Sequence, residues 1–136
     1  MPSIGQENLE RVMIDFFGAL RRGDVDAATA LLGPDVTWQG LREDWVCHGP
    51  KEVLETFRAG LEQRRDVDAL EFTRAGEQVV LGARGPSIGD VEGDQPAGQI
   101  FNVWTLRDGR IVRIDDYGRR SDAFAAAGIA DGMGWR

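Results

Sequence analysis

The chain has 136 residues, of which 42% are hydrophobic and 29% charged, and 16 basic against 23 acidic side chains give a net charge of −7. This length and composition are typical of one globular domain and exclude a largely disordered chain. An acidic surface repels phosphate backbones, which argues against nucleic acid as a partner.

The sequence also argues against membranes, disulfides and metals. No apolar run approaches the ~20 residues that span a bilayer, and the N-terminus lacks a basic start followed by an apolar stretch. We therefore expect a cytoplasmic protein without a membrane partner. The single cysteine, Cys47, excludes an internal disulfide and a cysteine-rich zinc site. With one histidine and scattered acids, we expect no metal.

The first half of the chain predicts helices around one short strand. Apolar residues recur at helical spacing before Gly23 and again after Pro50, which is typical of amphipathic helices. The expected elements are helices over 6–22 and 24–32, a strand over 35–40, a loop over 41–49 and a third helix over about 50–64.

The second half predicts antiparallel strands. Asp108-Gly109 is a strong hairpin signal, and Ser121 is typical of a helix N-cap. The expected elements are strands near 70–72 and 79–81, a loop over 85–96, strands over 98–107 and 110–118, and a short helix from Ser121 to Gly128. Helices followed by such strands indicate a single α+β domain, with its core over about 6–128 and a loose tail over 129–136.

Both faces of the strand over 98–107 are apolar. Asn102 and Trp104 share one face, and Phe101 and Val103 share the other. One face must meet the helices. Because the other is also apolar, we expect it to meet a second subunit, as a homodimer packed through the outer face of the sheet.

The order of these parts resembles the nuclear transport factor 2-like superfamily, in its SnoaL-like branch. The resemblance covers about 6–128 and depends on the long first helix, the strand with Trp38, the pair His48-Gly49 and the hairpin that ends at Asp116-Tyr117. It implies a cone-shaped, curved antiparallel sheet wrapped by three to four helices, with an apolar pocket at the open end, usually in a homodimer.

The resemblance implies different chemistry for each enzyme group of the superfamily. The catalytic Tyr and two Asp positions of ketosteroid isomerases hold Phe16, Gly40 and Asn102 here. The hydroxyl donor and the base are therefore absent, which argues against that reaction.

Limonene-epoxide hydrolases are the second group. Their second catalytic Asp matches Asp116, but their Arg-x-Asp positions hold Ala83 and Gly85. Epoxide opening needs an acid and a base, so this activity requires an altered site.

SnoaL-like polyketide cyclases are the third group. Resemblance to them implies a cofactor-independent acid/base site in an apolar pocket, with Asp116 and His48 as its catalytic residues. The candidate ligand-binding residues are Phe16, Trp38, Trp45, Phe57, Asn102, Trp104 and Ile114.

The hairpin decides which of Asp115 and Asp116 faces the pocket, since neighbouring residues of a strand face opposite sides. A two-residue turn at Asp108-Gly109 would pair Asn102 with Asp115. A three-residue loop with a bulge shifts the pairing by one residue and pairs Asn102 with Asp116. The resemblance favours the bulged form, and burial should then raise the pKa of Asp116.

The leading interpretation is a SnoaL-like protein that binds a small apolar, polyketide- or steroid-like molecule and acts as an isomerase, cyclase or hydratase. Three alternatives remain open. They are a non-catalytic ligand-binding or accessory domain, an epoxide hydrolase with an altered site, and a dimerisation module. Interior aromatic side chains that fill the pocket would favour a structural domain, and polar groups converging on Asp116 would favour catalysis.

Overall fold

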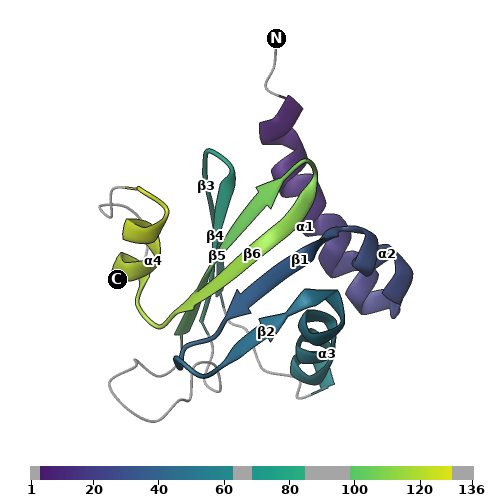
Figure 1. Ribbon diagram of the computed structural model, residues 1–136. Helices are drawn as coiled ribbons and strands as arrows, with labels where there is room; N and C mark the ends of the chain where they lie inside the picture. The colour runs from purple at the N-terminus through teal and green to yellow at the C-terminus, as the bar shows by residue number, and fades with distance from the viewer. Residues whose placement is uncertain (1–3, 63–68, 85–98, 130–136) are drawn as a thin grey trace.

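The computed structural model describes residues 4–62, 69–84 and 99–129 (Figure 1). Within them, a curved, open sheet carries three helices on one face and a fourth helix on the other. The helices are α1 (Ile4–Arg22), α2 (Val25–Ala30), α3 (Gly49–Glu62) and α4 (Arg120–Ala126). The strands are β1 (Leu32–Gln39), β2 (Val46–His48), β3 (Ala69–Ala75), β4 (Gln78–Arg84), β5 (Gln99–Arg107) and β6 (Arg110–Tyr117).

The strand order across the sheet is β2-β1-β6-β5-β4-β3. All neighbouring pairs are antiparallel except β1 and β6, which run parallel. The first strand of the chain therefore lies beside the last one, near the middle of the sheet (Figure 1). This arrangement confirms the predicted α+β fold, and the sheet stays open at the β2 and β3 edges.

The main core lies between the helices and the inner face of the sheet, which is the face that carries Trp38, Trp104 and Ile114. Phe16 from α1 and Val53 from α3 are fully buried against this face. Both belong to the apolar stripes that the helical spacing predicted. Burial of these stripes, rather than intrinsic helix propensity, supplies most of the stability of such helices.

The opposite, outer face of the sheet is partly covered by α4. Phe101 and Val103 are buried to 0% and 1% exposure in a second cluster with Ala123 and Phe124 of that helix. The prediction that a second subunit covers Phe101 and Val103 is therefore wrong, because the chain returns after β6 and covers them itself. A homodimer through the rest of this face stays a prediction.

Two predicted boundaries differ at the start of the sheet. The second helix ends at Ala30, and β1 already begins at Leu32, so Gly33-Pro34 lie inside a strand. The Ile111 N–H donates to the Leu31 carbonyl at 2.8 Å, which draws this segment into the sheet.

The predicted loop over 41–49 contains the short strand β2, which pairs with β1. Near the C-terminus, Ser121 lies inside the first turn of α4. Arg119 takes the N-cap position without a side-chain hydrogen bond. The predicted loop over 85–96 and most of the tail over 129–136 lie outside the described residues.

The hairpin between β5 and β6 has the predicted register, but the extra residue lies in the strand β6 and not in the turn. Arg107 pairs with Arg110 across a two-residue turn, in which Asp108 and Gly109 both have positive φ (54° and 75°). The extra residue lies in β6 itself, where the pairing shifts between Thr105 and Leu106 and leaves Val112 as a bulge. The bulge pairs Asn102 with Asp116.

Candidate functional site

Asp116 lies on the inner face of the sheet and is held by two hydrogen-bond donors. The Trp38 indole N–H donates to its Oδ1 at 2.7 Å, and the Asn102 amide donates to the same oxygen at 2.5 Å. The three side chains come from the adjacent strands β1, β5 and β6. The parallel pairing of β1 with β6 therefore brings together residues that are 78 positions apart in the sequence.

Aromatic rings pack against one another on the same face of the sheet, beginning at Trp38. Phe57 of α3 stacks on Trp38 with ring centroids 4.4 Å apart, and it stacks on Trp104 at 5.6 Å. Phe16 meets Phe57 edge-on at 5.3 Å, and Ile114 is fully buried on the same face. The structure thus brings together six of the seven predicted ligand-binding residues, and Asp116 with them.

Burial is the largest influence on the acidity of Asp116 and raises the pKa of its carboxyl to about 7 from the ordinary 3.8. The hydrogen bonds from Trp38 and Asn102 act in the opposite direction, because they stabilise the carboxylate. The negative charge of Asp115 raises the pKa a little further. The predicted increase in the pKa of Asp116, and burial as its cause, are confirmed.

The two oxygens of Asp116 have different surroundings. Oδ1 accepts both hydrogen bonds, whereas Oδ2 accepts none within the described part of the chain. Oδ2 is therefore the oxygen that remains available as an acceptor. The Trp104 indole nitrogen, in contrast, is buried and has no acceptor among the residues described.

Asp115 lies on the outer face, as predicted. Its Oδ2 accepts a hydrogen bond from Arg113 Nε at 2.8 Å. This ion pair raises the pKa of Arg113. Because Asp115 is turned away and paired, it does not form an acid pair with Asp116.

His48 is not brought to Asp116. It lies in the edge strand β2, pairs with Thr37 and is exposed to solvent. Thr37 pairs in turn with Arg113, so His48 lies on the outer face while Asp116 lies on the inner one. The backbone N–H of His48 donates to Glu52 Oε1 at 3.0 Å, which ties the start of α3 to β2. The geometry therefore gives His48 no route to act with Asp116.

Trp45 lies on the connection between β1 and β2, with 47% of its surface exposed. The Gly40 N–H donates to the Trp45 carbonyl at 2.7 Å, and a Cβ added at Gly40 would meet the Trp45 Cβ at 2.9 Å. The Arg42 guanidinium lies 5.4 Å from the centre of the Trp45 ring. Only a glycine at position 40 lets Trp45 lie this close to the end of β1.

Gln39 is a site-supporting residue that the sequence reading missed. Its side-chain amide donates to the Arg42 carbonyl at 2.9 Å and to the Glu43 carbonyl at 3.3 Å. These bonds hold the 40–45 connection that presents Trp45. The signal that could have indicated this role is a glutamine near the end of a predicted strand, just before a loop.

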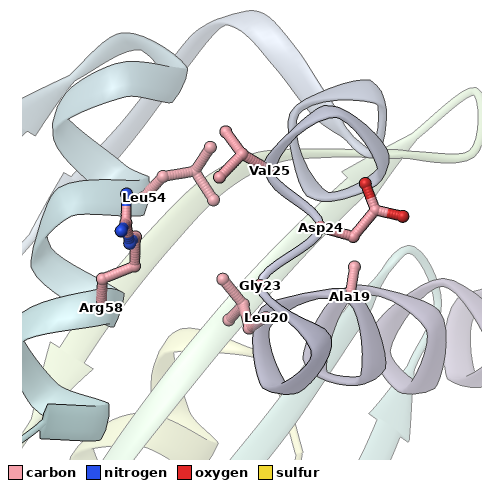
Figure 2. Close-up of a pocket in the computed structure, with 7 residues that line it drawn as sticks. All are labelled: Ala19, Leu20, Gly23, Asp24, Val25, Leu54 and Arg58. Atoms are coloured by element: carbon pink, nitrogen blue, oxygen red, sulfur yellow. The ribbon is translucent and has the colours of Figure 1, made fainter.

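A small hollow lies elsewhere, between the end of α1, the start of α2 and one side of α3 (Figure 2). It measures about 20 Å³, which is room for about one water molecule. Its lining residues are Ala19, Leu20, Gly23, Asp24, Val25, Leu54 and Arg58. None of them is a predicted site residue, so this hollow is separate from the surroundings of Asp116.

Residues 13–114 match the SnoaL-like domain family. The chain belongs to this family. The match begins in the middle of α1, at Met13, and ends in β6 at Ile114, two residues before Asp116. A comparison with curated proteins finds no match.

Solved structures share the nuclear transport factor 2-like fold of this SnoaL-like domain. A candidate polyketide cyclase from Sinorhizobium meliloti is 22% identical with a TM-score of 0.59, over 79% of this chain and 94% of that one. Another from Xanthomonas campestris is 18% identical with a TM-score of 0.57, over 90% and 98%. TerC, co-crystallised with polyporic acid, is 20% identical with a TM-score of 0.57, over 88% and 97%.

Within residues 4–62, 69–84 and 99–129, no group of three or more His, Cys, Asp or Glu side chains is placed to hold a metal ion. In the same ranges, every helix is too short or too polar to cross a bilayer.

Proposed function

We propose that this SnoaL-like domain binds a small apolar or polycyclic molecule and uses Asp116 as a cofactor-independent acid/base in isomerisation, cyclisation or hydration. One observation carries the proposal. Asp116 is a largely buried carboxyl group beside stacked aromatic rings, and both of its hydrogen bonds from described residues go to one oxygen, which leaves the other available.

A pKa of about 7 suits this role. At neutral pH, both the acid and the carboxylate of Asp116 are present in comparable amounts. A group in this range can donate a proton and take one back, which is the requirement for general acid/base catalysis near neutrality. The neighbouring Trp38 and Phe57 rings make the surroundings of this carboxyl group apolar, which suits an aromatic or polycyclic ligand.

The relatives suggest which ligands to test first. Two of the similar structures are candidate polyketide cyclases, and the third was crystallised with polyporic acid. A polyketide- or steroid-like ligand therefore remains our proposal for this chain.

A non-catalytic ligand-binding or accessory domain is the second candidate. The observation that favours it is the position of Phe57, whose ring stacks on both Trp38 and Trp104 and takes up space that a ligand would need. Epoxide hydrolysis is less well supported, because Asp115 points to the other face and pairs with Arg113.

The test is the Asp116→Asn variant. Binding of polyporic acid and of a panel of steroids and aromatic polyketides is measured by tryptophan fluorescence, and turnover is measured by mass spectrometry. We expect the variant to bind within a few-fold of wild type, because Asn keeps the acceptor oxygen for Trp38 and Asn102. We expect turnover to fall by roughly 10²–10⁴, the usual contribution of a positioned acid/base.

Asp115→Asn is the matched control, since it removes a neighbouring carboxylate on the opposite face and should leave turnover within a few-fold. Wild-type turnover in the Asp116→Asn variant would sink the acid/base proposal. A wild-type protein that binds members of the panel but converts none of them would favour the non-catalytic domain.

A further inference from the structure

The two donors that reach Asp116 converge on one oxygen instead of sharing the carboxyl group between them. Trp38 Nε1 lies 2.7 Å from Oδ1 and Asn102 Nδ2 lies 2.5 Å from the same atom. The two donors come from opposite neighbours of β6 in the sheet, β1 and β5. Oδ2 accepts no hydrogen bond from the described residues.

This asymmetry determines where a proton resides. An indole N–H and an amide NH₂ can only donate, so the oxygen that accepts both has its lone pairs occupied. A neutral carboxyl group then keeps Oδ1 as its carbonyl oxygen and carries its hydrogen on Oδ2. The proton is therefore on the oxygen that no described donor occupies.

We propose that Trp38 and Asn102 are positioning residues that assign the proton of Asp116 to Oδ2 and direct it toward an acceptor oxygen of the bound molecule. This inference rests on the proposed acid/base function and extends it to two residues that do not themselves exchange protons. When Oδ2 gives up its hydrogen to the ligand oxygen, the O–H bond of Asp116 breaks and the carboxylate remains. The negative charge that develops on Oδ1 is met by two donors already in place.

The position of the proton on Asp116 is set by the two donors, because the other described side chains that face this carboxyl group from neighbouring elements carry no charge. From β1 and β5 the facing groups are Trp38 and Asn102, and from α3 the nearest contact in the cluster is Phe57 against Trp38; none of these titrates near neutral pH. Asp115 is the charge that acts on Asp116, and it is paired with Arg113 on the other face.

The experiment measures Asp116 directly and needs no substrate. Aspartate is labelled with ¹³C at Cγ, the resonance that disappears in Asp116→Asn is assigned to Asp116, and its pKa is read from a pH titration. In Trp38→Phe and Asn102→Leu, the carboxylate loses one donor and its pKa should rise, by about one unit or a tenfold change in proton affinity. Asp115→Asn should shift the pKa in the opposite direction, because it removes a repelling charge.

Infrared spectroscopy provides a second measurement, and its main comparison needs only the wild-type protein and Asp116→Asn, not the two donor variants. The C=O stretch of protonated Asp116, isolated by subtracting the Asp116→Asn spectrum at pH 5, should lie at low frequency, because the carbonyl oxygen accepts two hydrogen bonds. Trp38→Phe should raise this frequency. A wild-type stretch typical of a free carbonyl, or wild-type pKa values in both donor variants, overturns the positioning roles. Loss of turnover in Asp116→Asn tests the proposed function separately.

Discussion

At Asp116, burial and hydrogen bonding act on the same carboxyl group in opposite directions. Burial favours the neutral acid, and the donors Trp38 and Asn102 favour the carboxylate. Burial has the larger effect, so the pKa rises to about 7, but the donors keep the carboxylate within reach of neutral pH. A carboxyl group with burial alone would titrate higher, and one with donors alone would remain ionised.

This balance predicts a pH-dependent stability. Between the ordinary pKa of 3.8 and the folded value of about 7, the folded chain holds a proton that the unfolded chain has lost. Stability from this group is therefore complete below pH 4 and is lost as the pH rises through 7, by at most about 4 kcal/mol. Asp116→Asn should lack this loss, so its stability relative to wild type should increase by up to roughly 3 kcal/mol from pH 5 to pH 8.

Urea unfolding of both proteins at pH 5 and pH 8 measures the effect. The two proteins share every other titrating group, so the difference between them isolates Asp116. A constant difference across this pH range would show that the carboxyl group is not buried as described.

The residues of the site differ in how far sequence reasoning could reach them. The pairing of Asn102 with Asp116 follows from strand alternation once a bulge is assumed. Trp38 was predicted as a ligand-binding residue, but its role as a donor depends on a side-chain rotamer that no sequence pattern reveals. His48 was assigned to a loop, and without the three-residue strand β2 its face could not be predicted.

At the scale of elements, two irregular segments meet where β1 lies beside β6. The pairing of β1 with β6 shifts between Leu32 and Thr37, and the bulge at Val112 lies opposite this stretch. A Cβ added at buried Gly33 would lie 3.2 Å from Val112 Cγ1 and 3.5 Å from the Ile111 carbonyl. The glycine therefore makes room for the bulge that turns Asp116 inward.

A double-mutant cycle tests this contact. Gly33→Ala should destabilise the fold by about 1–2 kcal/mol, because the added methyl group crowds Val112. In the Val112→Ala background, the same substitution should be nearly neutral, since Cγ1 is gone. The free energies of unfolding from urea titration give the coupling, and strictly additive effects would contradict the proposed contact.

The hairpin shows why the register was predictable although its cause was not. Asp108-Gly109 correctly indicated a tight turn, but a dipeptide does not say whether an extra residue lies in the loop or in the strand. The structure places it at Val112, where the sequence offers only an ordinary β-branched residue. The bulge packs closely against Gly33 of β1, which lies 79 residues earlier in the chain, and a local sequence pattern cannot show such a contact.

At the scale of the whole molecule, α4 is fixed to the sheet by a nearly buried ion pair. Arg120 donates from Nε and Nη2 to both carboxylate oxygens of Glu71 on β3, at 2.9 Å and 3.1 Å. The Arg120 guanidinium also lies 3.8 Å from the centre of the Phe124 ring. This contact connects the last helix to an edge strand and keeps Phe101 and Val103 covered.

Glu71→Gln should loosen α4. Breaking a buried pair by removing one partner costs about 3–5 kcal/mol, and we expect roughly 2–3 kcal/mol here because Gln keeps one acceptor oxygen. Hydrogen exchange should accelerate at the amides of α4 and of β5 beneath it. Asp115→Asn breaks the more exposed pair with Arg113 on the same face and should cost less than about 1 kcal/mol. Equal losses in the two variants would mean that the Glu71 pair does not fix α4.

The fold class was predictable because the order of amphipathic helices and strands along the chain indicates an α+β domain. The covering of the outer face was not, since Phe101 and Val103 indicate only that some apolar partner lies over them. A seven-residue helix at the C-terminus gives too weak a pattern to identify it as that partner.

The adjacency of β1 and β6 has a consequence for folding. The indole of Trp38 reaches the Asp116 carboxyl group only after the early and late segments of the chain have met. In a partly folded species in which these segments are still apart, Asp116 is solvated and its pKa stays near the ordinary 3.8. The ¹³Cγ chemical shift of Asp116 at pH 6 therefore reports when β1 pairs with β6 during refolding, and the experiment needs no label other than the isotope.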